Sequence, residues 1–166
     1  MRKIKRTFQK PRHPWNKERM EKETVLMKTY GLRRKAELWK SESIMRDFKR
    51  RARFLAATRD KVQEKILLDK LNKMGLLGKD ANLDSVLSLT VENLLDRRLQ
   101  TVVLRKTLAN TSKQARQLIT HCHIAVEGRK IRYPNFLVPI NLEDKISFYK
   151  ELGVKTPKPK ESEING

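Results

Sequence analysis

Apolar residues recur at helical spacing in the middle of the chain, between residues 95 and 122. Thr111, followed at the third position by Gln114, is a capping box that predicts the start of a helix. In this helix the positions i, i+3, i+4 and i+7 are apolar: Ala115, Leu118, Ile119 and Cys122. The other side carries positive charge and hydrogen-bond donors: Lys113, Arg116, Gln117 and Thr120. One face of the helix therefore packs, and the other is available for binding.

A second amphipathic helix is predicted directly before the first. Its apolar stripe consists of Leu95, Leu99, Val102 and Val103. Four basic residues are expected to face away from that stripe: Arg97, Arg98, Arg105 and Lys106. Either helix alone could carry its charges as an ordinary solvated face. Two adjacent helices that are both basic on the outside favour a compact surface for phosphates.

Alternating residues after these helices predict short antiparallel strands. Residues 123–131 alternate around Glu127-Gly128, which is the signature of a tight hairpin. A short strand is predicted over 136–138, and a closing strand over 144–149.

The region before residue 95 has the pattern of a helical domain. Helices are predicted over about 16–30, 34–39, 41–57 and 62–74, with Gly31 and Gly75 as stops. The helix over 41–57 has an apolar stripe of Ile44, Phe48, Ala52 and Leu55. It also has a basic edge at the same spacing, made of Arg46, Lys49, Arg50 and Arg53. Only Asp47 is nearby to pair with these charges, so the edge suits a phosphate backbone.

Residues 60–96 form a nearly neutral connector. Charges of both signs mix on the exposed side of the helix over 62–74, which is typical of a solvated surface. Residues 78–82 predict a loop, and Asp84 or Thr90 would cap the short helices beyond it. We therefore expect this connector to pack the two basic parts together rather than to contact nucleic acid.

These elements together predict an α+β fold in four parts. A basic arm over 1–16 precedes a helical RNA-binding region with its connector over 17–95. A small module of two packed helices and short antiparallel strands covers 96–150, and a tail covers 151–166. Prolines and the lack of an apolar stripe predict little intrinsic structure in the arm and the tail, with Trp15 as the anchor available to the arm.

Net charge is the property of the composition that says most about the partner of this chain. The 166 residues hold 39 Lys+Arg against 19 Asp+Glu, a net charge of +20. Residues 1–59 hold 20 basic against 6 acidic side chains, and residues 97–142 hold 9 against 1. Two such blocks favour a polyanionic partner that neutralises their self-repulsion. A membrane is disfavoured, because no apolar run approaches the roughly 20 residues of a span and no helix sets a broad apolar face against its lysines.

Three motifs in the second basic block are similar to the S-four (S4) RNA-binding domain. They are R-R-L-Q-T at 97–101, T-S-K-Q-A-R-Q-L-I at 111–119 and I-A-V-E-G-R at 124–129. The flanks resemble the archaeal and eukaryotic type of ribosomal protein S4, through H-P-W at 13–15, Y-G-L-R at 30–33, E-L-W-K at 37–40, F-K-R-R-A-R at 48–53 and L-S-L-T-V-E-N-L-L at 87–95. The chain departs from this family at Thr107 and Cys122, where the family has glycine. Without a glycine, the helix before Cys122 is expected to end differently or to run on.

The resemblance implies a structural component of the small ribosomal subunit that binds the 5′ domain of small-subunit rRNA and helps nucleate assembly. It implies ribosomal protein S-five as a neighbour, a cytoplasmic position beside the channel where mRNA enters, and a role in decoding accuracy. The alternative is a paralogue that processes precursor rRNA and leaves before the subunit matures. The predicted RNA-binding residues are Arg46, Lys49, Arg50, Arg53, Arg97, Arg98, Gln100, Arg105, Lys106, Lys113, Arg116, Gln117, His121, Arg129 and Lys130.

No residue pattern predicts an enzyme, a cofactor or a metal site. His121, Cys122 and His123 are adjacent, so their side chains leave the end of the helix in different directions, and a fourth ligand is missing. The motifs G-x-x-x-x-G-K, G-x-S-x-G and H-E-x-x-H are absent. RNA-modifying enzymes that carry this module add a catalytic domain, for which too few residues remain here.

Overall fold

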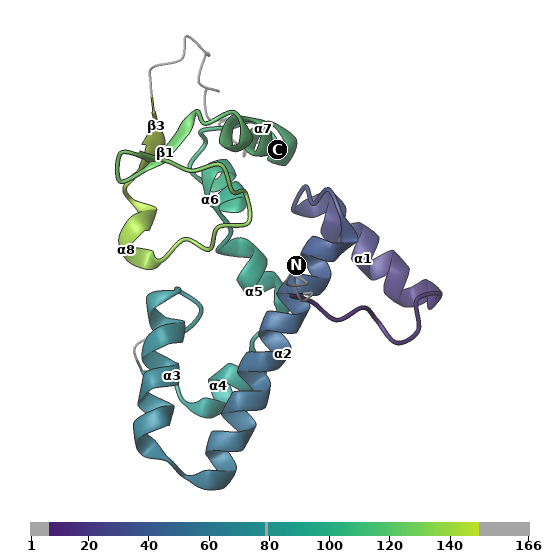
Figure 1. Cartoon of the computed structure of the whole chain (residues 1–166), viewed down its shortest axis with the longest axis vertical. Helices are drawn as coiled ribbons and strands as arrows, with labels where there is room; N and C mark the ends of the chain where they lie inside the picture. The colour runs from purple at the N-terminus through teal and green to yellow at the C-terminus, as the bar shows by residue number, and fades with distance from the viewer. Residues whose placement is uncertain (1–6, 79, 150–166) are drawn as a thin grey trace, which may run out of the picture.

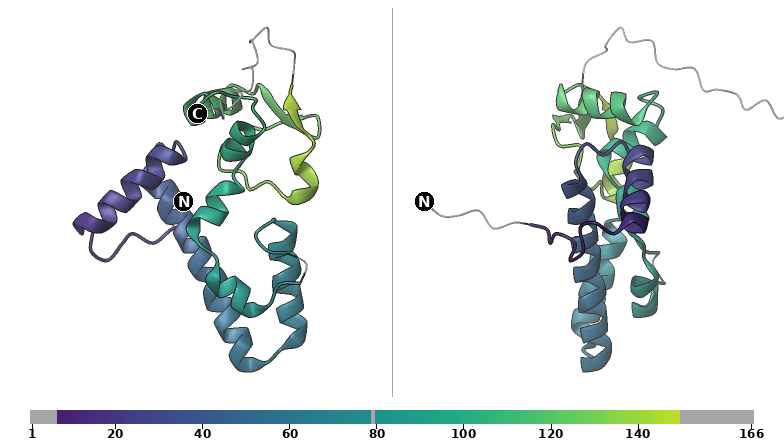
Figure 2. Two further views of the ribbon diagram at one scale, coloured as in Figure 1. Left: turned by 180° about the vertical axis from the view of Figure 1, so that it is seen from behind. Right: turned by 90° about the vertical axis from the view of Figure 1, so that its right-hand side faces the viewer.

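The computed structural model describes residues 7–78 and 80–149 and has the predicted α+β fold. Its helices are α1 (Lys17–Thr29), α2 (Lys35–Thr58), α3 (Lys61–Lys73), α4 (Leu83–Ser88), α5 (Val91–Asp96), α6 (Leu99–Arg105), α7 (Ser112–Thr120) and α8 (Ile140–Glu143), and its strands are β1 (Ile124–Val126), β2 (Arg129–Lys130) and β3 (Ile146–Phe148). The hairpin of α2 and α3 lies at one end of an elongated molecule, and α7 lies with the sheet at the other (Figure 1). Turned by 90°, the molecule is much narrower (Figure 2, right).

α2 is a single helix of 24 residues, so the prediction of two helices over 34–39 and 41–57 is wrong. The junction contains neither glycine nor proline, the residues that usually interrupt a helix. Ser41 and Ser43 donate their hydroxyls to the carbonyls of Glu37 and Trp39, at 3.2 and 2.8 Å, so both serines bond within the helix. The buried face also continues across the junction, because Leu38 lies on the same side as the predicted apolar stripe.

Glycine ends two of the helices in this region, as predicted. α1 and α3 stop just before Gly31 and Gly75, which adopt left-handed conformations at φ +59° and +72°. The amides of Leu32 and Leu76 then reach back five residues to carbonyls of the helix, at 3.0 and 3.1 Å. This pattern satisfies carbonyls that the end of a helix would otherwise leave without partners.

The connector packs against α2, which belongs to the first of the two basic parts that it is expected to hold together. Its helices share a core with α2, made of Met45, Phe48, Ala52, Leu55, Leu67, Leu71, Leu76, Val86, Leu89 and Leu94. Thr90 precedes α5 as predicted, and its amide donates to the side chain of Asn93 at 3.0 Å. The prediction for Asp84 is wrong, because Asn82 is the residue before α4.

A second core lies between α6, α7 and the sheet. It consists of Leu99, Val102, Val103, Ala109, Ala115, Leu118, Ile119, Ile124, Val126, Val138 and Ile146. Thr111 caps α7 as predicted, and its hydroxyl accepts the Gln114 amide at 3.2 Å. The Gln114 side chain bonds the amide of Asn110 at 2.8 Å, one residue earlier than in a standard capping box.

The sheet contains the predicted hairpin and the predicted closing strand. β1 pairs antiparallel with β2 on one side and with β3 on the other. Glu127 and Gly128 both have positive φ, at 55° and 77°, which a tight hairpin turn requires. The prediction of a strand over 136–138 is wrong. Residue 137 forms only an isolated bridge to the chain that leads into α6, and that chain takes up the hydrogen bonds of this segment.

The two residues that replace the glycines of the family still adopt the left-handed backbone conformation. Thr107 and Cys122 have φ of 55° and 63°, and α7 ends at Thr120 without running on. The amide of His123 donates to the Leu118 carbonyl at 2.9 Å, the same five-residue bond that follows the glycines. A side chain in this conformation costs about 1–2 kcal/mol, which the surrounding packing offsets.

The arm is anchored by a different residue from the one predicted. Trp15 is 87% exposed, whereas the ring of Phe8 lies 6.0 Å from that of Trp39, and the Gln9 amide donates to Ser43 at 3.2 Å. The rest of the predicted arm, residues 1–6, and the predicted tail lie outside the described residues. In the part that is described, no helix has the length and apolarity needed to cross a bilayer.

Candidate nucleic-acid interface

The basic edge predicted on α2 lies at the surface. Arg46, Arg50 and Arg53 are exposed, and Lys49 is half-buried. Arg46 donates to a serine hydroxyl at 3.2 Å, and Arg50 lies 3.0 Å from the carboxylate of Asp47. Exposed contacts of this kind contribute little to folding. These guanidinium groups are therefore free to exchange them for phosphate oxygens, which they bind more strongly.

Arg97 and Arg98 were expected to face outward, and that prediction is wrong. They are only 9% and 3% exposed. Arg97 donates to Glu143 at 2.6 Å and to the Val138 carbonyl at 2.8 Å, and Arg98 donates to Glu37 at 2.8 Å. Both arginines lie in the bend between α5 and α6, which turns their side chains into the molecule.

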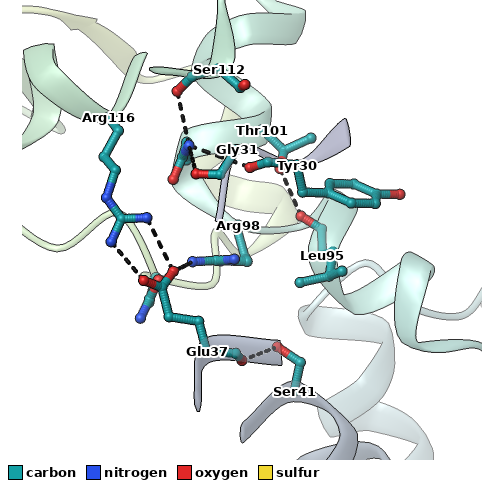
Figure 3. A network of polar contacts seen from close by, with 11 residues as sticks. Tyr30, Gly31, Glu37, Ser41, Leu95, Arg98, Thr101, Ser112 and Arg116 are labelled. Carbon is teal, nitrogen blue, oxygen red and sulfur yellow. Dashed lines mark hydrogen bonds and ion pairs between the residues drawn. The ribbon is translucent and has the colours of Figure 1, made fainter. Parts of the chain in front are cut away.

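Glu37, from the first turn of α2, lies between Arg98 and Arg116 (Figure 3). Its carboxylate accepts from Arg98 at 2.8 Å and from Arg116 at 2.7 and 3.1 Å. Burial opposes ionisation of this carboxyl, but the hydrogen bonds from Arg116 and Arg98 outweigh it and lower the pKa of Glu37. Burial also lowers the pKa of Arg98. Arg116 was predicted on the binding face of α7; it is half-buried and holds α7 against α2.

Gln100, another predicted RNA-binding residue, also lies inside the molecule. Its Nε2 lies 3.3, 3.1 and 2.8 Å from the carbonyl oxygens of Tyr30, Gly31 and Ser112. A Cβ at Gly31 would lie 2.5 Å from the Ser112 hydroxyl, so only glycine fits this close approach. Gln100 thus joins the turn between α1 and α2 to the start of α7.

A basic hollow of about 620 Å³ opens where these two parts meet. It is lined by Thr24, Met27, Lys28, Gly31, Leu32, Arg33, Lys35, Lys113 and Arg116, with no carboxylate among them. Two of the five cations have acidic partners, since Lys35 lies 3.4 Å from Glu23 and Arg116 binds Glu37. The other three, Lys28, Arg33 and Lys113, form no ion pair within the described ranges. Three unpaired cations around one hollow suit a phosphate group.

The remaining predicted residues lie at or near the surface of the C-terminal part. The exposed ones are Arg105, Lys113, Gln117, His121, Arg129 and Lys130. Lys106 is half-buried, with its Nζ 3.5 Å from the carboxylate of Asp144. The Nζ of Lys130 lies 4.1 Å from the centre of the Tyr149 ring, a cation–π contact.

Sequence reasoning did not select Lys28, Arg33 and Lys35, which line the hollow. Arg33, Arg34 and Lys35 form a run of three cations that begins two residues after Gly31. This run of cations was the feature of the sequence that could have indicated a basic surface there. Its position beside α7 depends on the packing of α1 and α2, which no local pattern reveals.

No metal site is assembled from residues 7–78 and 80–149, where no three His, Cys, Asp or Glu side chains come together. The rings of His121 and His123 lie 6.3 Å apart between centroids. Cys122, between them, accepts a hydrogen bond from Arg132 at 3.0 Å.

Comparison with known proteins finds similarity over nearly the whole chain. A family model described as the S4 domain matches residues 97–144. The chain is 46% identical over 168 residues to the small ribosomal subunit protein uS4 of Sulfolobus acidocaldarius, covering 99% of this chain and 96% of that protein. It is 52% identical over 141 residues to the protein of the same name from Hyperthermus butylicus, covering 83% and 80%. The corresponding protein of Methanococcus aeolicus is 50% identical over 151 residues, covering 89% and 85%.

Proposed function

This chain belongs to the uS4 family of small ribosomal subunit proteins, and from that premise we propose that it binds small-subunit rRNA directly as a structural component of the subunit. The proposal rests on one observation. Exposed cations without strong acidic partners gather on the edge of α2 and around the hollow between α1, α2 and α7. Basic surfaces from both parts of the chain can then bind neighbouring segments of one folded RNA.

The structure changes which residues are proposed to contact RNA. The principal contacts are Lys28, Arg33, Arg46, Lys49, Arg50, Arg53, Lys113 and Gln117. Arg105, Lys106, His121, Arg129 and Lys130 are additional contacts at the far end. The buried side chains of Arg98 and Gln100, and the paired Arg116, act instead by fixing the two parts relative to each other. Arg97 is buried within the C-terminal part, where it binds Glu143.

The proposal extends to the place of the protein in the subunit. The motifs that resemble ribosomal protein S4 support binding to the 5′ domain of the rRNA during early assembly, in the cytoplasm. They also support contact with ribosomal protein S-five, a position near the channel where mRNA enters, and an influence on decoding accuracy.

Salt dependence of binding tests the proposed contact with phosphates. If about 6–10 phosphates are neutralised, affinity of the full chain for small-subunit rRNA falls by about 10³ to 10⁵ between 50 and 200 mM salt. Filter binding across this range gives the slope. A nearly flat dependence would remove the phosphate contacts from the proposal.

Sedimentation tests the structural role separately. A structural component stays with mature small subunits that are pelleted through a high-salt cushion. A chain found on precursor particles alone would instead be a processing factor, and the proposed function would be wrong.

A further inference from the structure

The hairpin of α2 and α3 carries an apolar groove that the fold leaves open. Leu55 and Leu67 lie at its base and belong to the core. Phe54 and Ile66 line it although they are 65% and 56% exposed, and Val62, one turn before Ile66, is 69% exposed. The groove has a volume of about 620 Å³, enough for several side chains of a partner. Exposed apolar side chains that line a groove, rather than standing singly on the surface, are a feature of interaction sites.

The rim of this groove is basic. Arg50, Arg51 and Lys70 line it together with Gln63, and no acidic side chain does. Arg51 and Lys70 form no ion pair within residues 7–78 and 80–149, so their charges are available to a partner. The groove therefore combines an apolar floor with positive charge on both helices.

The groove lies on a different side of α2 from most of the proposed RNA-binding edge. At 100° per residue, positions five apart differ by about 140° around a helix. Arg51 is therefore turned away from Arg46, and Phe54 is turned away from Lys49 by the same angle. Arg50 lies between the two surfaces. An occupant of the groove that binds Arg51 and Lys70 can thus be present while an RNA along the edge binds Arg50.

We propose that this groove docks an amphipathic segment of a neighbouring protein in the small ribosomal subunit, with apolar side chains in the groove and carboxylates on its basic rim. The inference rests on the proposed function, which places the chain in that subunit. Apolar anchors inserted between two helices, with charged groups at the rim, are a common mode of peptide recognition.

Charge and chemistry favour this occupant over the others. A second copy of this chain would bring a net charge of +20 against a basic rim, which opposes association. A nucleic acid base would stack on Phe54, but it gains little from the aliphatic side chains of Val62 and Ile66. An acidic amphipathic segment satisfies both the apolar floor and the cations.

A photo-crosslinker at position 66 of the full chain tests the proposal directly. Ile66 is replaced by p-benzoylphenylalanine in cells, small subunits are purified at high salt and irradiated, and the crosslinked product is sequenced. The expected product is a peptide of another small-subunit protein, with apolar residues at helical spacing and Asp or Glu beside them. Crosslinks to rRNA alone, to a second copy, to a segment of this chain, or to nothing would overturn the proposal.

The identified peptide, made synthetically, then tests the groove itself on the purified full chain. The double variant Phe54→Ala/Ile66→Ala should weaken binding by about tenfold or more, because such anchors carry most of the affinity. Arg51→Glu should also weaken it, and a peptide with Lys in place of its acidic residue should restore binding to that variant. Val25→Ala removes an equally exposed apolar side chain from α1 and serves as the control, with no change expected. Equal affinity for the double variant and the parent chain would refute docking in this groove.

Sedimentation of the crosslinker-bearing chain separates the two proposals. If the chain is present on small subunits but its crosslinks reach only RNA, the docking site is wrong and the proposed function stands. If the chain is absent from the subunits, both are wrong, because the partner is placed there.

Discussion

Arginines on α2 and arginines at the start of α6 have opposite environments, although both sets are outward-facing in the sequence pattern. Arg46, Arg50 and Arg53 are exposed, with only weak or solvent-accessible contacts. Arg97 and Arg98 are buried and bind Glu143 and Glu37 at 2.6 and 2.8 Å. The first set is suited to a phosphate backbone, whereas the second links segments of this chain.

The difference shows that positive charge by itself does not define an RNA-binding surface. A buried guanidinium has lost its hydration, so its burial is tolerated only where carboxylates and carbonyls replace the water. An exposed guanidinium keeps its hydration and can exchange it for phosphate. Arg116 lies between these cases, because it is half-buried and shares Glu37 with Arg98.

The largest expected effect is a loss of folding stability when an arginine of the buried set is replaced. Arg98→Ala should lower the free energy of unfolding by about 3–5 kcal/mol, because it removes one partner of a buried ion pair. Urea denaturation measures the change. Arg53→Ala on α2 is the matched control and should shift stability by no more than about 0.5 kcal/mol. Equal losses in the two variants would mean that the two sets of arginines do not differ in the way described.

A smaller effect on folding stability is expected when the pH is changed, because Glu37 takes up a proton in acid. Its pKa is lower in the folded chain than the ordinary value of 4.5, so the unfolded chain binds more protons between these two values and stability rises with pH there. The contribution is complete above about pH 4.5 and is lost as the pH falls through the folded pKa. Denaturation of the parent chain and of Glu37→Gln at several pH values should show a difference in stability that shrinks in acid.

Glu42, on the same helix, provides a control, because its pKa is shifted in the opposite direction from that of Glu37. Burial, together with the nearby Glu23, raises the pKa of Glu42 above 4.5. Its contribution is therefore present in acid and lost as the pH rises through the folded value. The difference between the parent chain and Glu42→Gln should change with pH in the direction opposite to that for Glu37→Gln.

Substitutions of exposed basic residues should weaken RNA binding and leave folding stability unchanged. Arg53→Ala and Lys113→Ala should each lower the slope of log affinity against log salt by roughly one unit, because each removes about one phosphate contact. Melting temperatures should stay close to that of the parent chain. Filter binding at several salt concentrations measures the slope. Early melting with normal RNA binding would place these two residues with the structural arginines.

The smallest effect concerns the ends of the helices, where the two regions also differ. Gly31 and Gly75 end helices in the N-terminal region, whereas Thr107 occupies the same left-handed position after α6. Thr107→Gly should stabilise the chain by about 0.5–1 kcal/mol, since the strain removed exceeds the entropy added. Gly31→Ala should do the reverse, because its Cβ would lie 2.5 Å from the Ser112 hydroxyl. Thermal melting measures both changes, and a destabilised Thr107→Gly would contradict the account of strain.

Local features of the fold follow from residues close together in the chain. The apolar stripes of α2 and α7, the cap at Thr111, the stops at Gly31 and Gly75 and the turn at Glu127-Gly128 each depend on a few neighbouring residues, and the structure confirms them. The predicted helix with its stripe from Leu95 to Val103 is instead divided between α5 and α6. The motifs shared with ribosomal protein S4 likewise identified the family. The proposed division of the chain at residues 16, 95 and 150 stays a prediction.

Only the tertiary structure decided which cations are buried and which are free. Arg98 meets Glu37 across 61 positions of sequence, and Arg97 meets Glu143 across 46. The hollow joins Lys28 and Arg33 to Lys113 of a different helix. A periodic pattern describes one helix at a time, and so it cannot show which carboxylate another segment will bring beside a charge. Burial and pairing of charge depend on such distant partners, because the free energy of a buried ion is set by everything packed around it.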